Sequence, residues 1–135
     1  MTTFGFRISP AVTNEELNAL FVTAWEHHVA SDFSPILSRS LLYICAYDGE
    51  RLIGFVNLAW DGGIHAFLLD TTVHADYQQR GIGVMLVQKA IEAAQVRGIE
   101  WVHVDYEPHL KAFYTRCGFR PTEAGLLNLV TSSAL

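Results

Sequence analysis

The chain has 135 residues, half of them hydrophobic, and a formal net charge of −5 at pH 7. This length suits one domain over residues 1–135, and the apolar content is enough for a core without a disulfide or metal staple. The acidic balance argues against a nucleic-acid partner, because nucleic-acid-binding domains usually carry a basic face. The sequence has neither a membrane-spanning apolar run nor a signal peptide, so we expect a cytoplasmic protein without a membrane partner.

The first forty residues predict one strand and two helices. Thr3–Ile8 alternates apolar and polar residues, as a half-buried strand does. Thr13, with Glu16 three residues later, is a capping-box pattern that begins a helix. Ser34 followed by Pro35 suits the first turn of a short second helix.

Three strands joined by tight turns are predicted next. The β-rich run 41–47 is linked by Asp48-Gly49, a strong hairpin signal, to the run 51–60. Gly54 within the second run indicates a bulge. A glycine-rich turn then leads into a third strand, 64–73. Strands that follow one another in this way form an antiparallel meander.

The second half of the chain changes to helical spacing. Apolar residues from 83 onward lie on one helix face, and Gly98 suits the position just after the helix end. A strand over 99–104, a helix over 108–116 and a last strand over 125–131 are predicted next. The helical crossover makes strand 99–104 a parallel neighbour of the strand before it. The fold class is therefore α+β, with a mixed, mostly antiparallel twisted sheet and flanking helices.

The turn before the long helix carries the main functional signal. It reads Gln78-Gln79-Arg80-Gly81-Ile82-Gly83. A strand, a glycine-bearing turn and a helix in this order direct the unpaired N–H groups of the helix start at an anion. Gly81 and Gly83 allow phosphates to approach closely. Leu86 breaks the dinucleotide pattern GxGxxG, and no P-loop sequence follows, so nucleotide-binding interpretations are disfavoured.

Two motifs resemble those of the GCN5-related N-acetyltransferase (GNAT) superfamily. Residues 73–83 resemble its (Q/R)xxGx(G/A) acyl-CoA loop, and Phe113–Phe119 resembles its second signature, an aromatic pair followed by Gly-Phe. The resemblance is clearest from about Arg51 to Phe119. It implies the GNAT fold and acetyl-CoA as the acyl donor, without a metal.

The resemblance also implies which residues bind the donor. Backbone amides of the turn would bind the pyrophosphate, with Gln78 bracing the loop and Arg80 either adding a contact or lying in solvent. Backbone groups of the preceding strand would pair with the pantetheine amides as an added strand would. The predicted donor-binding residues are Thr71, Thr72, Val73, Gln78, Gln79, Arg80, Gly81, Ile82, Gly83 and Val84.

The implied reaction is direct transfer of an acetyl group to a primary amine in a ternary complex. Tyr114 is predicted to donate a hydrogen bond to the departing sulfur. A base must also take the proton of the amine. The candidates are Asp70, Asp105, Glu107 and His65. Asp105 is preferred, with capping of the following helix as its alternative role, and alternation places Asp70 and His65 on opposite faces.

The motifs leave the acceptor open between a small molecule, a polyamine and a peptide. The family often has Asn where this chain has Glu107, so we expect this carboxylate to contact a cationic acceptor. Phe33 lies where the family builds its acceptor pocket. Two alternatives remain, a non-catalytic acyl-CoA-binding regulatory module and a transferase that uses another acyl-CoA. An exposed edge strand near the C-terminus would allow a homodimer.

Two further sets of residues are assigned no chemistry. His103, Asp105 and His109 lack metal-ligand spacing, so no metal site is predicted. Cys45 and Cys117 lie far apart in the sequence and are expected to be buried and reduced. The helix end at Cys117 should also make this thiol a poor nucleophile.

Overall fold

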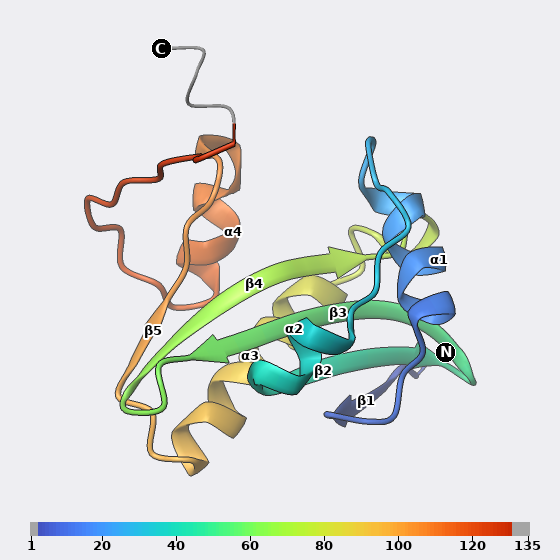
Figure 1. Cartoon of the computed structure of the whole chain (residues 1–135), viewed down its shortest axis with the longest axis horizontal. Helices are drawn as coiled ribbons and strands as arrows, with labels where there is room; N and C mark the ends of the chain where they lie inside the picture. Colours follow the sequence, from blue (N-terminus) through green and yellow to red (C-terminus); the bar gives the residue numbers. More distant parts are fainter. Residues whose placement is uncertain (1–2, 131–135) are drawn as a thin grey trace. The chain divides into compact units, whose positions relative to one another are not determined.

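One sheet organises residues 3–130, which the computed structural model describes (Figure 1). Among these residues, five strands lie in the order β1-β2-β3-β4-β5. Their bounds are β1 Gly5–Ile8, β2 Ser40–Asp48, β3 Arg51–Trp60, β4 His65–Val73 and β5 Trp101–His103. The first four strands pair antiparallel and β5 pairs parallel to β4. The predicted mixed sheet, its meander and its parallel pair are confirmed. The chain divides into two compact units, residues 1–104 and 105–135, and each is described by itself.

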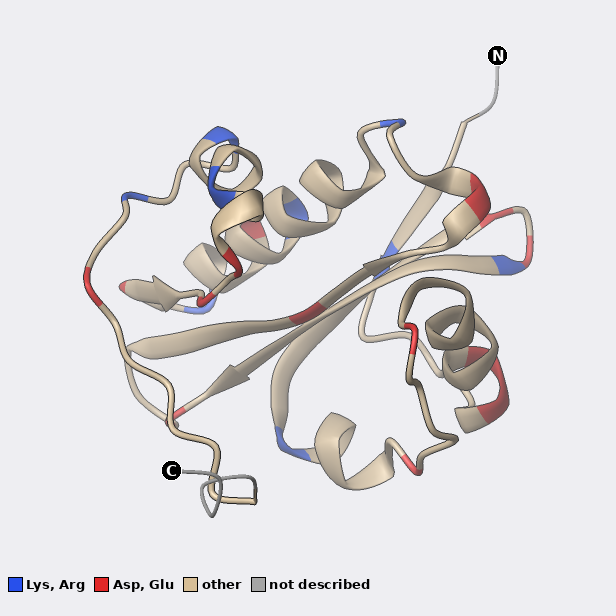
Figure 2. Ribbon diagram, turned by 90° about the horizontal axis from the view of Figure 1, so that it is seen from above, with Lys and Arg blue, Asp and Glu red and all other residues tan. Residues whose placement is uncertain are grey.

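Helices cover both faces of the sheet in the first unit. Figure 2 shows α3 (Ile82–Val96) on one face and both α1 (Asn14–Ala24) and α2 (Ser34–Arg39) on the other. The capping box predicted for α1 is present, because Thr13 Oγ1 accepts from the Glu16 amide and the Glu16 carboxylate accepts from the Thr13 amide. The 3₁₀ turn η1 (Ala75–Tyr77) joins β4 to the turn before α3. Gly98, at φ +82°, follows the end of α3 as predicted.

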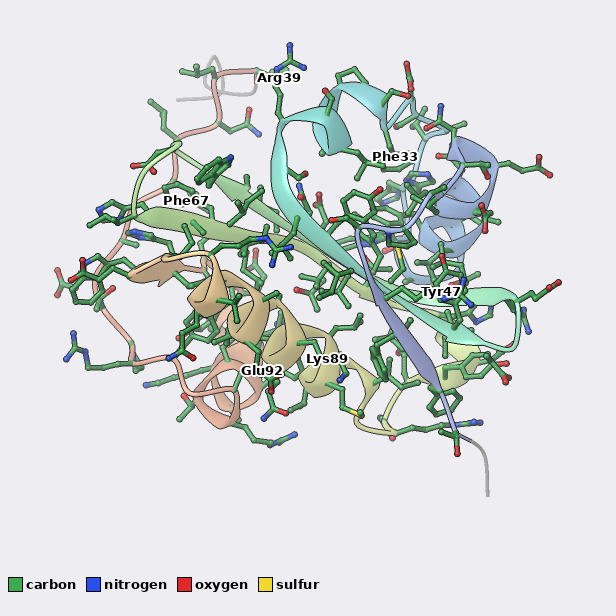
Figure 3. The ribbon with its side chains drawn as sticks, turned by 90° about the horizontal axis from the view of Figure 1, so that it is seen from below. Phe33, Arg39, Tyr47, Phe67, Lys89 and Glu92 are labelled. Carbon is green, nitrogen blue, oxygen red and sulfur yellow. The ribbon has the colours of Figure 1, made fainter. Side chains whose placement is uncertain are left out.

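The hydrophobic core fills both sides of the sheet. On the α1 side, the Phe21 ring lies 5.2 Å from Phe33 and 5.9 Å from Phe55. On the other side, Gly54 lets α3 approach closely, since a Cβ there would lie 3.0 Å from Leu86 Cδ1. Figure 3 shows the same division, with Phe33 beside α1 and Glu92 on α3. The two packed faces fix the orientation of α3 and therefore of the turn that precedes it.

Register shifts interrupt the long strands at three places, and two of them bear on the predictions. The pairing changes from Ala46↔Gly54 to Tyr47↔Leu52, which places a bulge at the position indicated by Gly54. A second extra residue lies in β4, where Asp70 has a left-handed φ of +59°. This bulge was not predicted, and it interrupts the alternation on which the opposite-face prediction for Asp70 and His65 rested. The register is regular from Ala66 to Leu69, so alternation holds up to Leu69, and the opposite-face placement of Asp70 remains a prediction.

The second unit contains the turn η2 (Pro108–Leu110) and the helix α4 (Lys111–Arg116). Pro108 begins this segment as predicted, although its first turn is 3₁₀. The predicted last strand is wrong for residues 125–130, which form no strand, and Thr131 lies outside the described residues. The side chains of Leu126, Leu127, Leu129 and Val130 are exposed. Their apolar pattern fits a strand, but the structure pairs residues 125–130 with no neighbouring strand.

The cysteine prediction is confirmed, because Cys45 and Cys117 are both buried and free. Burial raises the pKa of Cys45 to about 12 and also raises the pKa of Cys117. Neither thiol is therefore activated as a nucleophile. Within residues 3–130, no helix is both long and apolar enough to cross a membrane.

Candidate functional site

The N–H groups at the start of α3 are available to donate hydrogen bonds to a bound ligand. Gly81 precedes the helix at φ +81°, and no side chain caps it. The first turn closes where the Met85 amide donates to Gly81 O at 3.1 Å. The amides of Ile82, Gly83 and Val84 come before this bond, so they have no carbonyl partner within the helix. The contrast with the fully capped α1 makes this helix start suitable for an anion.

Side-chain hydrogen bonds hold the turn in place. Gln78 Nε2 donates to Val73 O at 3.1 Å, which is the bracing contact predicted for this residue. The Tyr77 hydroxyl donates to Asp48 Oδ2 at 2.6 Å, and the Tyr77 amide donates to His74 O at 2.8 Å. Gln79, like Gly81, has a positive φ, of +62°. The turn is thus a defined structure tied to β2 and β4.

Two arginines bring positive charge to this end of the sheet. The guanidinium carbon of Arg80 lies 5.2 Å from the centre of the Tyr77 ring, and that of Arg51 lies 5.8 Å from it. The hydrogen bond to Asp48 is the main reason why the pKa of Tyr77 is raised. Although the net charge of the chain is −5, two cations thus lie around Tyr77, in the segment that leads into α3.

The edge of β4 offers a second binding feature. β5 pairs with β4 only at residues 65–67, and no described strand pairs with 68–73 on that side. The His74 amide donates to Ile53 O at 2.8 Å, which fixes the phase of the β3–β4 ladder. Alternation then turns the N–H group of Val73 away from β3, while the Val73 carbonyl accepts from Gln78 Nε2. This orientation is what an added strand-like ligand requires.

Thr72 and Asp70 lie on β4 in different environments from Val73. Thr72 is buried, and its Oγ1 accepts from Trp25 Nε1 at 2.9 Å and donates to Asp70 O at 2.8 Å. The Thr72 side chain thus ties β4 to the end of α1. Burial raises the pKa of the Asp70 carboxyl. The environment at the bulge therefore favours the protonated form of Asp70 over the charged form.

Tyr114, Asp105 and Glu107 belong to the second unit. Tyr114 is buried there, with its ring stacked 5.0 Å from Tyr106 and edge-on to Phe113 at 4.8 Å. Glu107, and not Asp105, occupies the position before η2, and its side chain makes no capping hydrogen bond. Both carboxylates belong to exposed residues. Their predicted roles remain predictions.

Phe33 is placed inside the first unit. It is 6% exposed, and its ring stacks 6.4 Å from His28 in the cluster that also holds Phe21. Packing in the core is therefore sufficient to explain why an aromatic residue occupies this position. Its contact with an acceptor remains a prediction.

The contact between the side chains of His65 and His103 could not be predicted from the sequence. His65 Nδ1 lies 2.8 Å from His103 Nε2, across the parallel pairing of β4 and β5. The sequence predicts His65 as one candidate base among four and assigns no chemistry to His103. The two residues lie in strands predicted to be parallel neighbours, so the missing information was their register. No group of three or more metal-ligating side chains occurs among the described residues.

A separate hollow of about 340 Å³ lies between β1 and the C-terminal half of α3. Its lining includes Phe6, Ile8, Lys89, Glu92 and Arg97. Figure 3 shows Lys89 and Glu92 along α3. The residues of α3 that line it come two turns or more after Gly81, so the hollow is distinct from the turn.

Known proteins resemble the chain in both sequence and fold. A chloroplastic GCN5-related N-acetyltransferase from Arabidopsis thaliana is 29% identical over 91 residues, covering 67% of this chain and 46% of the relative. A GNAT-family acetyltransferase from Streptococcus pneumoniae has a TM-score of 0.75 at 22% identity, covering 94% of this chain and 99% of the other. An aminoglycoside N-acetyltransferase solved in complex with CoA has a TM-score of 0.76 at 17% identity, with 95% of each chain covered.

These comparisons establish fold and family. The structural likenesses confirm the predicted α+β fold. The chain spans only 40% to 46% of the length of the first three curated relatives. The sequence pattern of the acetyltransferase (GNAT) family matches residues 11–119, which is most of the chain. The chain therefore belongs to the acetyltransferase (GNAT) family.

Proposed function

We propose that the protein transfers an acetyl group from acetyl-CoA to a primary amine. The observation that carries this proposal is the uncapped start of α3 behind Gly81, next to an edge of β4 without a strand partner. A pyrophosphate needs several N–H donors at one point, and a pantetheine arm needs an extended backbone with which to pair. Both features occur within fifteen residues of one another in the chain.

The residues of the turn fit the donor chemically. Nothing lies within 4 Å of the position that a Cβ on Gly81 would take, so the backbone there is open to a phosphate group. Amides from Gln79 to Val84 would donate to phosphate oxygens, and Arg80 and Arg51 would offset their charge. The Val73 N–H group would donate to a carbonyl of the pantetheine arm. The acetyl thioester supplies the activated acyl group for the reaction.

The chemistry requires help at two atoms. A thiolate must leave, and Tyr114 is our candidate to stabilise it by a hydrogen bond. Full proton transfer from a phenol of pKa about 10 to a thiolate of pKa about 8.5 is uphill by about 2 kcal/mol, so a hydrogen bond that strengthens as charge develops is enough. The amine must also lose a proton, and Asp105 is the carboxylate proposed from the family resemblance.

The proposed acceptor is a cationic small molecule, a polyamine or a peptide amine. The exposed Glu107 and the net charge of −5 support an acceptor that carries positive charge.

Two measurements on the full chain test this function. Calorimetric titration with acetyl-CoA should show one saturable site, and free CoA thiol should appear when an amine panel is added. The panel should include spermidine, glucosamine 6-phosphate, a lysine peptide and 2-phenylethylamine, with propionyl-CoA and succinyl-CoA as alternative donors. Tight binding without turnover on any amine would favour a non-catalytic module. Absence of acetyl-CoA binding would overturn the proposal.

A further inference from the structure

A row of partly or largely exposed side chains, four of them rings, crosses β4 and β5 around the place where the two strands pair. It consists of His65, Phe67 and Leu69 from β4 and of Trp101 and His103 from β5, and we call it the imidazole strip. Phe67 is 37% exposed, Leu69 38% and Trp101 51%. Single exposed apolar residues need no explanation, but neighbouring ones on one surface indicate a binding site.

The register places the whole strip on the α1/α2 face of the sheet. Phe55 packs against Phe21 of α1 and therefore points to this face. Ala59 lies four residues further along β3, so its side chain points the same way, and it pairs with Phe67. His103 pairs with Phe67, and Trp101 pairs with His65. α3 packs on the opposite face, so it does not cover the strip.

The two imidazoles form a hydrogen-bonded pair. At 2.8 Å between His65 Nδ1 and His103 Nε2, one ring must donate and the other accept. The Phe67 ring stacks on His103 at 4.8 Å and 23°, which fixes the orientation of that ring. The Asp61 carboxylate lies beside His65, because its Oδ1 accepts from the Gly63 amide at 2.7 Å and from the His65 amide at 3.4 Å. The pair can therefore accept a proton and share its charge between two rings.

The position of the strip complements that of the donor. Under the proposed function, on which this inference rests, the donor reaches the edge of β4 from the start of α3. The thioester would then lie beside the segment of β4 between Thr71 and Phe67. The amine would approach it from the α1/α2 face of the sheet, because α3 packs on the opposite face. The strip occupies the α1/α2 face, and Phe67 within it is the last residue of β4 that pairs with β5.

We propose that the imidazole strip is the acceptor site, that the His65–His103 pair takes the proton of the amine, and that the acceptor carries its amine on an aromatic or apolar group. The amine nitrogen forms a bond to the thioester carbonyl carbon, and the C–S bond breaks with its electron pair leaving on sulfur. The proton released from nitrogen passes to an unprotonated ring nitrogen of the pair and from there to solvent. The thiolate is protonated to the CoA thiol, so the products are an amide and a thiol.

The test uses His65→Gln, His103→Gln and Phe67→Ala in the full chain, with 2-phenylethylamine and ethanolamine as matched primary amines. His27→Gln, an exposed histidine after the end of α1, is the control. Each histidine variant should lower kcat by about 10- to 100-fold, because a general base contributes about 10²–10⁴ and the second ring remains. The loss should shrink for amines of lower pKa. Acetyl-CoA affinity should stay within about twofold of the unmodified chain.

Phe67→Ala tests the acceptor class separately. It should raise KM for 2-phenylethylamine by about tenfold and leave KM for ethanolamine unchanged, because only the first amine would cover the strip. A folded spectrum and an unchanged melting temperature for each variant would show that the exposed side chains are not needed for stability.

Several results would overturn the inference while leaving the proposed function intact. One is an unchanged kcat and pH profile in both histidine variants of an active enzyme. A second is a preference for spermidine or glucosamine 6-phosphate over 2-phenylethylamine. A third is stoichiometric Zn²⁺ binding by the pair with acetyl transfer unaffected. Failure of the unmodified chain to bind acetyl-CoA would instead remove the proposed function, and this inference with it.

Discussion

Gly81 combines a backbone requirement with an open surface. Its φ of +81° is a conformation that costs other residues about 1–2 kcal/mol, and a Cβ there would meet no protein atom within 4 Å. The backbone conformation therefore favours glycine at this position, and the proposed donor would use the open space beside it. Gly62 has almost the same φ, +83°, and equally open surroundings in the loop between β3 and β4.

We predict that Gly81→Ala and Gly62→Ala destabilise the fold by a similar amount, about 1 kcal/mol, because both pay the same backbone cost. Only Gly81→Ala should weaken acetyl-CoA binding, by about tenfold or more, since its Cβ would occupy space beside the turn amides. Thermal unfolding and calorimetric titration measure the two effects. Equal affinity of both variants for acetyl-CoA would contradict the placement of the donor.

Tyr114 offers a test of the leaving-group role. Tyr114→Phe keeps the ring, which is buried against Tyr106 and Phe113, and removes the hydroxyl. We expect kcat to fall by about 10- to 100-fold with little change in acetyl-CoA affinity, because the lost hydrogen bond acts on charge that develops during the reaction. Tyr106→Phe, in the stacked neighbour, is the control. An unaltered kcat in Tyr114→Phe would remove this residue from the mechanism.

Asp70 predicts a pH-dependent stability. Burial raises the pKa of its carboxyl, so the folded chain holds the proton more tightly than the unfolded chain does. The stability that this group contributes is complete below its usual value of 3.8 and is lost as the pH rises through the raised pKa. Asp70→Asn should therefore raise Tm at pH 7 and have little effect near pH 3. Asn also tolerates the left-handed backbone at this position. A larger gain at pH 3 than at pH 7 would show that the sign is wrong.

At the scale of elements, α3 depends on its buried face. Leu86 is fully buried against the sheet beside Gly54, whereas Met85, one residue earlier, is exposed. Leu86→Ala should cost about 2–5 kcal/mol, from lost burial and the cavity that remains, and Met85→Ala should cost much less. Chemical denaturation measures both. Equal costs would mean that α3 is not held by this contact.

Local patterns predicted most elements of the first unit. The capping box at Thr13, the hairpin at Asp48-Gly49 and the terminal Gly98 each act within a few residues, so sequence alone reveals them. The strand over 125–131 failed because a strand also needs a neighbour, which local alternation cannot supply. The bulge at Asp70 carries no glycine or proline signal, so it becomes visible only through the pairing of β3 with β4.

The same distinction between local and long-range signals applies to the candidate site. The turn at Gly81 is continuous in the sequence, so its motif could be recognised directly. The His65–His103 pair joins residues 38 positions apart and depends on the register of a parallel pair. Thr72 shows a further limit, because its bond to Trp25 links β4 to α1 across 47 positions.

For the molecule as a whole, the two faces of the sheet carry different candidate binding features. Under the proposed function, the acyl donor would bind at the uncapped helix start of α3, on one face. The face with α1 and α2 carries the imidazole strip. β4 contributes to both, through its edge after Phe67 and through His65 and Phe67 themselves.

The most direct test of the donor site is a titration of the ¹⁵N-labelled chain with acetyl-CoA, followed by amide chemical shifts. We expect the largest saturable changes at the amides of Gln79–Val84 and Thr71–Val73, where the uncapped helix start and the edge of β4 would bind the donor. Smaller changes are expected around the hollow lined by Lys89, Glu92 and Arg97. Saturable changes confined to that hollow, or no saturation at all, would contradict an acyl-CoA site at Gly81.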